Sequence, residues 1–186
     1  VAALNAQVDP RGLLIDDRSI PGPEGAPDVA IRIYRPERVT IPNGGLLYLH
    51  GGGFVVGSPD TEHGASVRIA KAISIPVISV DYRLAPENPY PAGLEDCYAA
   101  LCWLHSEADA LGIDRERIGI LGQSAGSGLA AGLALMARDR GGPGICFQFL
   151  GMPELDDRLE TVSMRRFVDT PLWNRPNAVR SWRLYL

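Results

Sequence analysis

Ser124 lies at the centre of the sequence Gly-Gln-Ser-Ala-Gly at residues 122–126, directly after an apolar run. Small residues two positions before and after a serine allow the chain to bend sharply and to expose the hydroxyl group. The first amide after such a serine stands at a helix N-terminus, where partial positive charge favours an anion. This pattern is typical of a nucleophilic serine. An ordinary helix N-cap serine is the alternative interpretation.

Three consecutive glycines follow His50, again directly after an apolar run. A glycine triplet costs conformational entropy and supplies no side chain, so it suits a place where backbone N–H groups must approach a ligand closely. In acyl transfer, such groups hold the negative oxygen of the tetrahedral intermediate. We expect the amides of Gly52, Gly53 and Ala125 to converge with the Ser124 hydroxyl on one carbonyl group. A tight turn without a ligand is the alternative.

The elements that must position both motifs follow from hydrophobic patterning. Continuous apolar runs are expected for strands covered on both faces, and they occur at residues 46–49, 76–80, 118–121 and 145–150. Apolar residues at helical spacing separate these runs, and this alternation predicts a parallel sheet. Two earlier strands, at 13–20 and 29–34, are expected to form an antiparallel edge. Both motifs then lie at the carboxyl edge of the same sheet, where such sheets build their sites.

Composition limits the possible classes of protein. The chain has 186 residues, 46% of them apolar and 22% charged, as in an ordinary single globular domain. The net charge of −4 argues against nucleic-acid binding, and no apolar run is long enough for a membrane span. Three cysteines without a CxxC pair predict neither a disulfide framework nor a metal site. Free cysteines and the lack of a signal pattern favour a cytoplasmic protein.

Three motifs in a fixed order resemble a known family. The sequences HGGGF, DYRLAPE and GQSAG begin at residues 50, 81 and 122, and together they resemble the hormone-sensitive-lipase-like esterases of the α/β-hydrolase fold. The resemblance implies that Ser124 is the nucleophile and that Gly52, Gly53 and Ala125 supply the oxyanion amides. It also implies that His50 holds the glycine loop and is not a base. The implied substrate is a small-molecule ester, with no metal and no cofactor.

The chain departs from the family pattern at two positions. Gln123 stands where this family most often has Asp, which weakens the subfamily assignment. The family often places a His directly after a Thr or Ser beyond the glycine loop. Here Glu62 separates Thr61 from His63, so we assign His63 no role.

A general base for the serine is not found at the expected place. The three histidines, His50, His63 and His105, all precede Ser124, whereas in α/β-hydrolases the acid and then the histidine follow the serine. Asp156, Asp157 and Asp169 do follow it, but they lie in residues 151–186, which match the cap side of the family. We count six strands where the family has eight. Residues 1–186 are therefore expected to be a single, C-terminally truncated α/β-hydrolase domain with a three-layer, mostly parallel sheet, whose last strand leaves an aggregation-prone edge.

These observations predict that the parent protein is a serine carboxylic-ester hydrolase working through an acyl-enzyme. The chain as it stands is expected to be inactive or nearly so without its base. The alternative from another class is a non-catalytic hydrolase-fold protein that binds a small ligand or a partner. A peptidase on the same fold would share the serine chemistry. The sequence predicts no particular oligomeric state.

Overall fold

The computed structural model describes residues 8–38 and 43–186. Within them six strands form one sheet in the order β1-β2-β4-β3-β5-β6. The strands are β1 (Leu13–Ile20), β2 (Val29–Pro36), β3 (Asn43–Leu49), β4 (Val77–Asp81), β5 (Ile113–Gln123) and β6 (Phe147–Gly151). β2 pairs antiparallel with β1 and β4, whereas β3, β4, β5 and β6 are paired in parallel. The predicted strands and the mostly parallel sheet with its antiparallel edge are confirmed.

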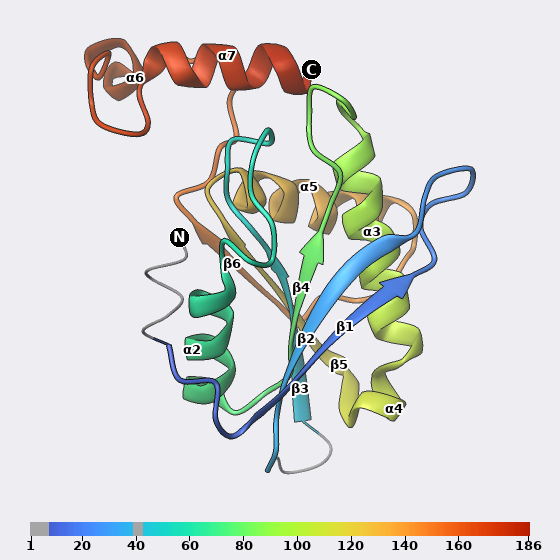
Figure 1. The fold of residues 1–186 in the computed structure, drawn as a ribbon. Coiled ribbons are helices and arrows are strands. Elements are labelled where there is room, and N and C mark those ends of the chain that lie inside the picture. Colours follow the sequence, from blue (N-terminus) through green and yellow to red (C-terminus); the bar gives the residue numbers. More distant parts are fainter. Residues whose placement is uncertain (1–7, 39–42) are drawn as a thin grey trace.

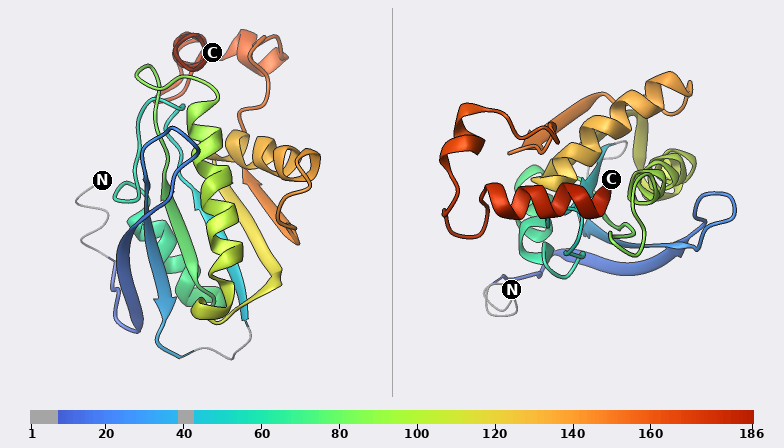
Figure 2. Two further views of the ribbon diagram at one scale, coloured as in Figure 1. Left: turned by 90° about the vertical axis from the view of Figure 1, so that its right-hand side faces the viewer. Right: turned by 90° about the horizontal axis from the view of Figure 1, so that it is seen from above.

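Helices cover both faces of the sheet, which gives the predicted three layers. The helices are α2 (His63–Ile73), α3 (Ala92–Ser106), α4 (Ala108–Leu111), α5 (Ala125–Asp139), α6 (Val162–Arg166) and α7 (Arg175–Tyr185). α2 lies on one face, and α3 and α5 lie side by side on the other (Figure 1; Figure 2, left). No helix in the described part of the chain is both long and apolar enough to cross a bilayer.

The central strands are buried on both faces, as their unbroken apolar sequences predict. In β3, Leu47 and Leu49 pack in the core beneath α3 and α5, whereas Leu46 and Tyr48 pack in the core beneath α2. Successive side chains of a strand point to opposite faces, so a strand between two helical layers has no polar face. The sheet thus holds the two chemical motifs on a rigid base.

Several strand bounds differ from the sequence-based expectation, and those of β5 differ most. β5 begins at Ile113, five residues before its apolar run, and residues 115–117 in this first part are charged and exposed. Its pairing with β3 shifts register between Asn43 and Gly45, so the polar stretch lies opposite an irregularity. The expectation that the apolar run at 145–150 is covered on both faces is wrong: β6 forms the sheet edge, and its Phe147 and Phe149 side chains are 55% and 52% exposed.

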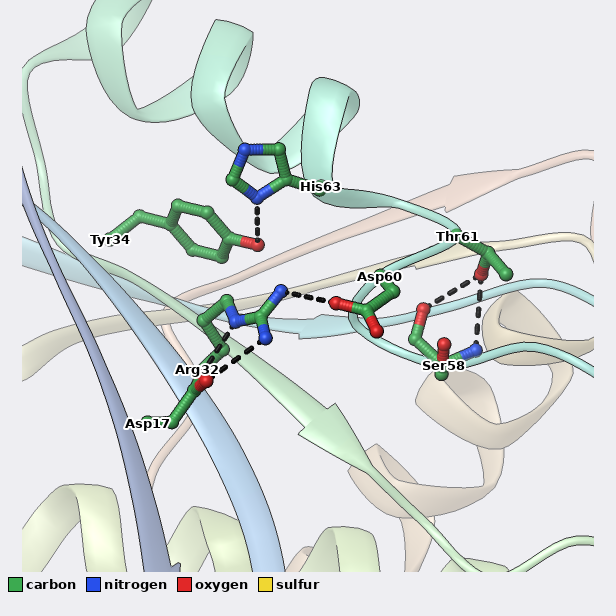
Figure 3. Close-up of polar contacts among 7 residues, drawn as sticks. All are labelled: Asp17, Arg32, Tyr34, Ser58, Asp60, Thr61 and His63. Carbon is green, nitrogen blue, oxygen red and sulfur yellow. Dashed lines mark hydrogen bonds and ion pairs between the residues drawn. The ribbon is translucent and has the colours of Figure 1, made fainter. Parts of the chain in front are cut away.

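An ion-pair network ties the loop after the glycine triplet to the sheet. Arg32 of β2 lies between Asp17 of β1 and Asp60, and its nitrogens are 2.6 Å from an oxygen of each carboxylate (Figure 3). His63, which begins α2, places its Nδ1 3.1 Å from the hydroxyl of Tyr34. His63 is thus engaged with β2, away from the two chemical motifs.

The segment after β6 crosses the carboxyl edge of the sheet and ends in α7, which lies above that edge (Figure 1; Figure 2, right). Tyr185 of α7 stacks on Phe54 with ring centroids 4.1 Å apart, and its carbonyl accepts a hydrogen bond of 2.7 Å from the Tyr90 amide. α7 therefore packs against the two loops that follow β3 and β4. The helix expected at residues 176–186 is present, one residue earlier at each bound.

Candidate active site

Ser124 occupies a sharp turn between β5 and α5. Its backbone has φ 53° and ψ −119°, in the left-handed region that non-glycine residues rarely adopt. A Cβ added at Gly122 would lie 2.2 Å from the carbonyl oxygen of Gly126, and one added at Gly126 would lie 2.2 Å from that of Leu49. Since backbone cannot yield as a flexible side chain does, glycine is required on both sides of the serine. The predicted bend is present, and it requires these glycines because a larger residue would clash with the neighbouring backbone.

The alternative of an ordinary N-cap serine is wrong. Ser124 stands at the N-cap position of α5, but its side chain makes no capping hydrogen bond. Its hydroxyl instead donates to Glu154, with Oγ and Oε1 2.8 Å apart. The side chain is thus turned away from the helix it precedes, and it is only partly buried.

The glycine triplet folds against this elbow. Gly52 and Gly53 have φ values of 129° and 58°, and a Cβ at Gly52 would lie 1.8 Å from the carbonyl oxygen of Val56. A Cβ at Gly51 would lie 3.5 Å from the Cβ of Ser124. Glycine is therefore needed for the tight loop, and the loop passes so near the serine that a side chain at Gly51 would touch it.

A cavity of about 630 Å³ joins the two motifs. Its lining comes from the glycine loop, the elbow, the proline corner and the segment that ends in α7: Gly52, Gly53, Val55, Val56, Pro86, Ser124, Leu172, Trp173, Asn177, Arg180, Ser181 and Leu184. Most of this lining is apolar, which suits an uncharged organic group. The expectation that both motifs meet at one edge of the sheet therefore agrees with the geometry.

The amides of Gly52, Gly53 and Ala125 are free to bind a ligand. Across residues 8–38 and 43–186, no backbone or side-chain oxygen accepts a hydrogen bond from these three N–H groups. Ala125 is the first residue of α5, so its amide also carries the positive end of the helix dipole. Such an arrangement can hold a negatively charged oxygen next to Ser124.

His50 lies beneath the glycine loop, is not among the residues that line the cavity, and forms no hydrogen bond with Ser124 in the described residues. Its ring is fully buried and stacks on Tyr82 with centroids 4.1 Å apart. Its Nδ1 donates to the Gly51 carbonyl oxygen at 2.8 Å, and the Tyr82 hydroxyl donates to the His50 carbonyl oxygen at 2.7 Å. Burial lowers the pKa of His50, so the ring stays neutral. These contacts suit a residue that supports the loop.

The segment after β6 holds the glycine loop from above. The Ser181 hydroxyl on α7 donates a hydrogen bond to the Gly53 carbonyl oxygen. A Cβ added at Gly53 would lie 3.1 Å from the Trp173 ring. Ser181, which is 128 positions further along the chain, thus fixes the orientation of the peptide group at Gly53.

Sequence analysis missed Glu154, which is the hydrogen-bond partner of Ser124. Its Oε2 is buried without a hydrogen-bond partner in the described residues, and burial raises the pKa of the carboxyl group. Glu154 follows β6 by three residues, so its place at the carboxyl edge was the signal that could have identified it. Asp156, which sequence analysis did consider, pairs instead with the exposed Arg158.

No histidine in the described part of the chain forms a hydrogen bond with Ser124. His105 is carried on α3, and His63 contacts Tyr34. The same residues hold no group of three or more His, Cys, Asp and Glu side chains that could bind a metal ion. Among residues 8–38 and 43–186, the proton acceptor within hydrogen-bond reach of the serine is therefore the Glu154 carboxyl group.

Comparison with known sequences gives carboxylesterases and esterases. Carboxylesterase NlhH of Mycobacterium tuberculosis is 40% identical over 163 residues, which cover 88% of this chain and 51% of that protein. The arylesterase of Saccharolobus solfataricus is 43% identical over 112 residues, covering 60% of this chain and 36% of that protein. The chain spans about half the length of the first of these relatives.

Comparison with solved structures agrees. A bacterial heroin esterase superposes with a TM-score of 0.97 at 49% identity, covering 100% of this chain and 59% of that chain. A hyperthermophilic esterase from the archaeon Pyrobaculum calidifontis superposes with a TM-score of 0.89 at 34% identity. The match covers 99% of this chain and 59% of that chain. The six strands described here thus match part of a longer esterase chain.

A family model described as alpha/beta hydrolase fold matches residues 46–186, which include all three motifs of the sequence. The match begins at the strand before the glycine triplet and extends through the elbow to α7. The chain therefore belongs to the α/β-hydrolase fold family and, within it, to the hormone-sensitive-lipase-like esterases that its motifs resemble.

Proposed function

We propose that this chain is the nucleophile-bearing part of a serine carboxylic-ester hydrolase. One observation carries the proposal: Ser124, Gly52 and Gly53 line one largely apolar cavity, and the amides of both glycines and of Ala125, the residue after the serine, have no hydrogen-bond acceptor in the described residues. The esterase names of its relatives support the same reaction class. The reaction needs neither a metal nor an organic cofactor.

The proposed reaction proceeds through an acyl-enzyme. Ser124 Oγ attacks the carbonyl carbon of the ester and loses its proton to a base. The carbonyl oxygen becomes negative and accepts hydrogen bonds from the three amides, which stabilise it because they are already oriented. The alcohol leaves with a proton, and water then releases the acid. In the whole protein we expect the base to be a histidine that follows the serine in sequence, supported by an acidic residue.

The cavity suggests the substrate class. Leu172, Trp173 and Leu184 form apolar walls, and Arg180 adds one charged group. We therefore propose a small ester whose acyl or alcohol part is uncharged. We also propose that residues 151–186 act as a cap within a single hydrolase domain, because α7 packs on the loop that carries Gly53.

The proposal is tested with the protein encoded by the longest open reading frame that contains these residues. Its hydrolysis of p-nitrophenyl acetate and of p-nitrophenyl butyrate is measured. Replacing Ser124 by alanine is expected to lower kcat by about 10⁴-fold or more. Ser163→Ala is the matched control, since Ser163 is an exposed serine on α6, and it should retain the parent rate. An unchanged rate in Ser124→Ala would refute the proposal.

A non-catalytic binding protein is the second candidate, and one observation favours it: the Ser124 hydroxyl donates to a carboxyl group and not to a histidine. This candidate predicts that an ester binds in the cavity and is not cleaved, and that Ser124→Ala binds it equally well. Calorimetric titration with a neutral ester, combined with product analysis, separates the two candidates.

We infer a cytoplasmic location from the cysteines. Cys97, Cys102 and Cys146 are all free thiols, as is typical of a reducing compartment. Fractionation of cells that produce the whole protein tests this inference, and recovery outside the cytoplasm would contradict it.

A further inference from the structure

Glu154 meets the geometric requirement for a base. Its Oε1 lies 2.8 Å from Ser124 Oγ, which donates the hydrogen bond. A base that takes a proton directly must lie about 2.6–3.2 Å from the donor atom. The serine proton already points at this carboxyl group, so its transfer requires no rearrangement of either side chain.

The surroundings of Glu154 favour its protonated form. The Oε2 atom is buried, and no donor in the described residues reaches it. Burial raises the pKa of Glu154, while the bond from Ser124 lowers it by a smaller amount. The Glu154 charge also acts on the Tyr82 phenol, whose pKa is raised chiefly by burial, so the phenol stays neutral. A carboxylate in such a site binds a proton more readily than one in water.

The backbone around Glu154 is fixed to the serine elbow. The Ser124 amide donates to the Gly151 carbonyl oxygen at 2.7 Å, and the Ser127 hydroxyl donates to the same oxygen at 3.0 Å. A Cβ added at Gly128 would lie 2.4 Å from the Glu154 carbonyl oxygen, so α5 packs closely beneath the residue. The carboxyl group is thus held at the serine by two neighbouring elements of the fold.

We propose that Glu154 is a catalytic residue that accepts the Ser124 proton and allows this chain to cleave an activated ester without a histidine. As the Oγ–carbon bond forms, the Oγ–H bond breaks and the proton binds Glu154 Oε1. The protonated carboxyl then gives that proton to the leaving alcohol as the carbon–oxygen bond of the ester breaks. Water repeats the sequence in deacylation, so Glu154 returns to its starting state.

This inference rests on the proposed function, since it assigns a further role at the same serine. The test uses the 186-residue chain and p-nitrophenyl acetate, with release of p-nitrophenol and acetylation of Ser124 followed together by absorbance and mass spectrometry. The chain is expected to acetylate on Ser124. Glu154→Gln keeps the size and a hydrogen-bond acceptor but cannot hold the proton, and it should acetylate about 10²-fold more slowly.

Two controls separate a proton acceptor from a merely structural carboxyl group. Asp157→Asn removes an exposed acid three residues away and should acetylate at the parent rate. Glu154→Ala leaves space beside the hydroxyl, so added formate should restore at least a tenfold increase in rate, with no such effect on Glu154→Gln. The parent rate should also rise with pH, with a midpoint above about 4.3, the ordinary pKa of glutamate, and this rise should be lost in Glu154→Gln.

The outcomes separate this inference from the proposed function. Equal acetylation rates for the parent chain and Glu154→Gln would overturn the role of Glu154, as would the absence of any acetylation of Ser124 in the 186-residue chain. In either case, ester hydrolysis that depends on Ser124 in the longer open reading frame would leave the proposed function standing. If the longer protein hydrolyses the ester equally well without Ser124, the proposed function and the role of Glu154 are both refuted.

Discussion

The serine elbow and the segment at residues 151–186 are built by different forces. At the elbow, backbone segments lie so close together that a Cβ at Gly122 would lie 2.2 Å from the Gly126 carbonyl oxygen, and a Cβ at Gly126 would lie 2.2 Å from the Leu49 carbonyl oxygen. The later segment is held by side chains, such as Tyr185 stacked on Phe54 and Ser181 bonded to the Gly53 carbonyl. Close backbone contact leaves a visible glycine pattern in the sequence, whereas side-chain contacts between distant residues do not.

The largest expected effect comes from adding a methyl group at the elbow. Gly126→Ala should lower the free energy of unfolding by about 3 kcal/mol, because the new Cβ meets the Leu49 and His50 carbonyl oxygens. Gly132→Ala on the same helix is the control, since its Cβ would meet the Leu94 side chain at 3.5 Å. It should raise stability by up to about 1 kcal/mol. Urea unfolding measures both, and equal effects would contradict the steric account.

A smaller effect is expected where α7 docks. Tyr185→Leu keeps an apolar group but removes the ring that stacks on Phe54, and should cost about 1.5 kcal/mol. Trypsin should then cleave at the arginines of the segment that no proline follows, such as Arg180 and Arg183, several times faster than in the parent chain. Leu186→Ala, at a side chain that is 63% exposed, should leave the cleavage rate unchanged. The same protection in both variants would show that the ring contact does not hold α7.

The hydrogen bond from α7 to the glycine loop should contribute less. Ser181→Ala leaves the buried Gly53 carbonyl without its donor and should cost about 1 kcal/mol of unfolding free energy. The same variant of the protein encoded by the longest open reading frame should lower kcat more than it changes KM, because the bond orients a peptide of the proposed oxyanion loop. If Ser181→Ala lowers stability but leaves kcat unchanged, the hydrogen bond from α7 does not orient the glycine loop for catalysis.

The smallest effect is expected from the charge on Glu154. Its pKa is raised in the folded chain, so between the unfolded and folded pKa values the folded state binds more protons. Stability should therefore fall as pH rises through the range above about 4.3, the ordinary pKa of glutamate. In Glu154→Gln that fall should disappear, while Asp157→Asn should keep it. Denaturant midpoints measured across the acid range provide the check, and parallel pH curves for parent and Glu154→Gln would contradict it.

Local pattern predicted the strands and the two chemical loops because each depends on short stretches of chain. The apolar runs at 46–49 and 118–121 and the glycines beside Ser124 are all visible within a few residues. The polar beginning of β5 was missed because it is extended without an apolar run. Glu154 was missed because its place after β6 indicates the carboxyl edge of the sheet, but does not show that β6 pairs with β5 and brings this side chain to the serine.

The central claim is that one hydroxyl and three amides act on the same carbonyl group. A crystal structure of the protein encoded by the longest open reading frame, after reaction with an alkyl phosphonate, tests this claim most directly. The phosphonate adduct resembles the tetrahedral intermediate. The account predicts phosphorus bonded to Ser124 Oγ, with its free oxygen about 2.7–3.1 Å from the amides of Gly52, Gly53 and Ala125. Phosphorus on another residue, or an oxygen turned away from those amides, would contradict the account.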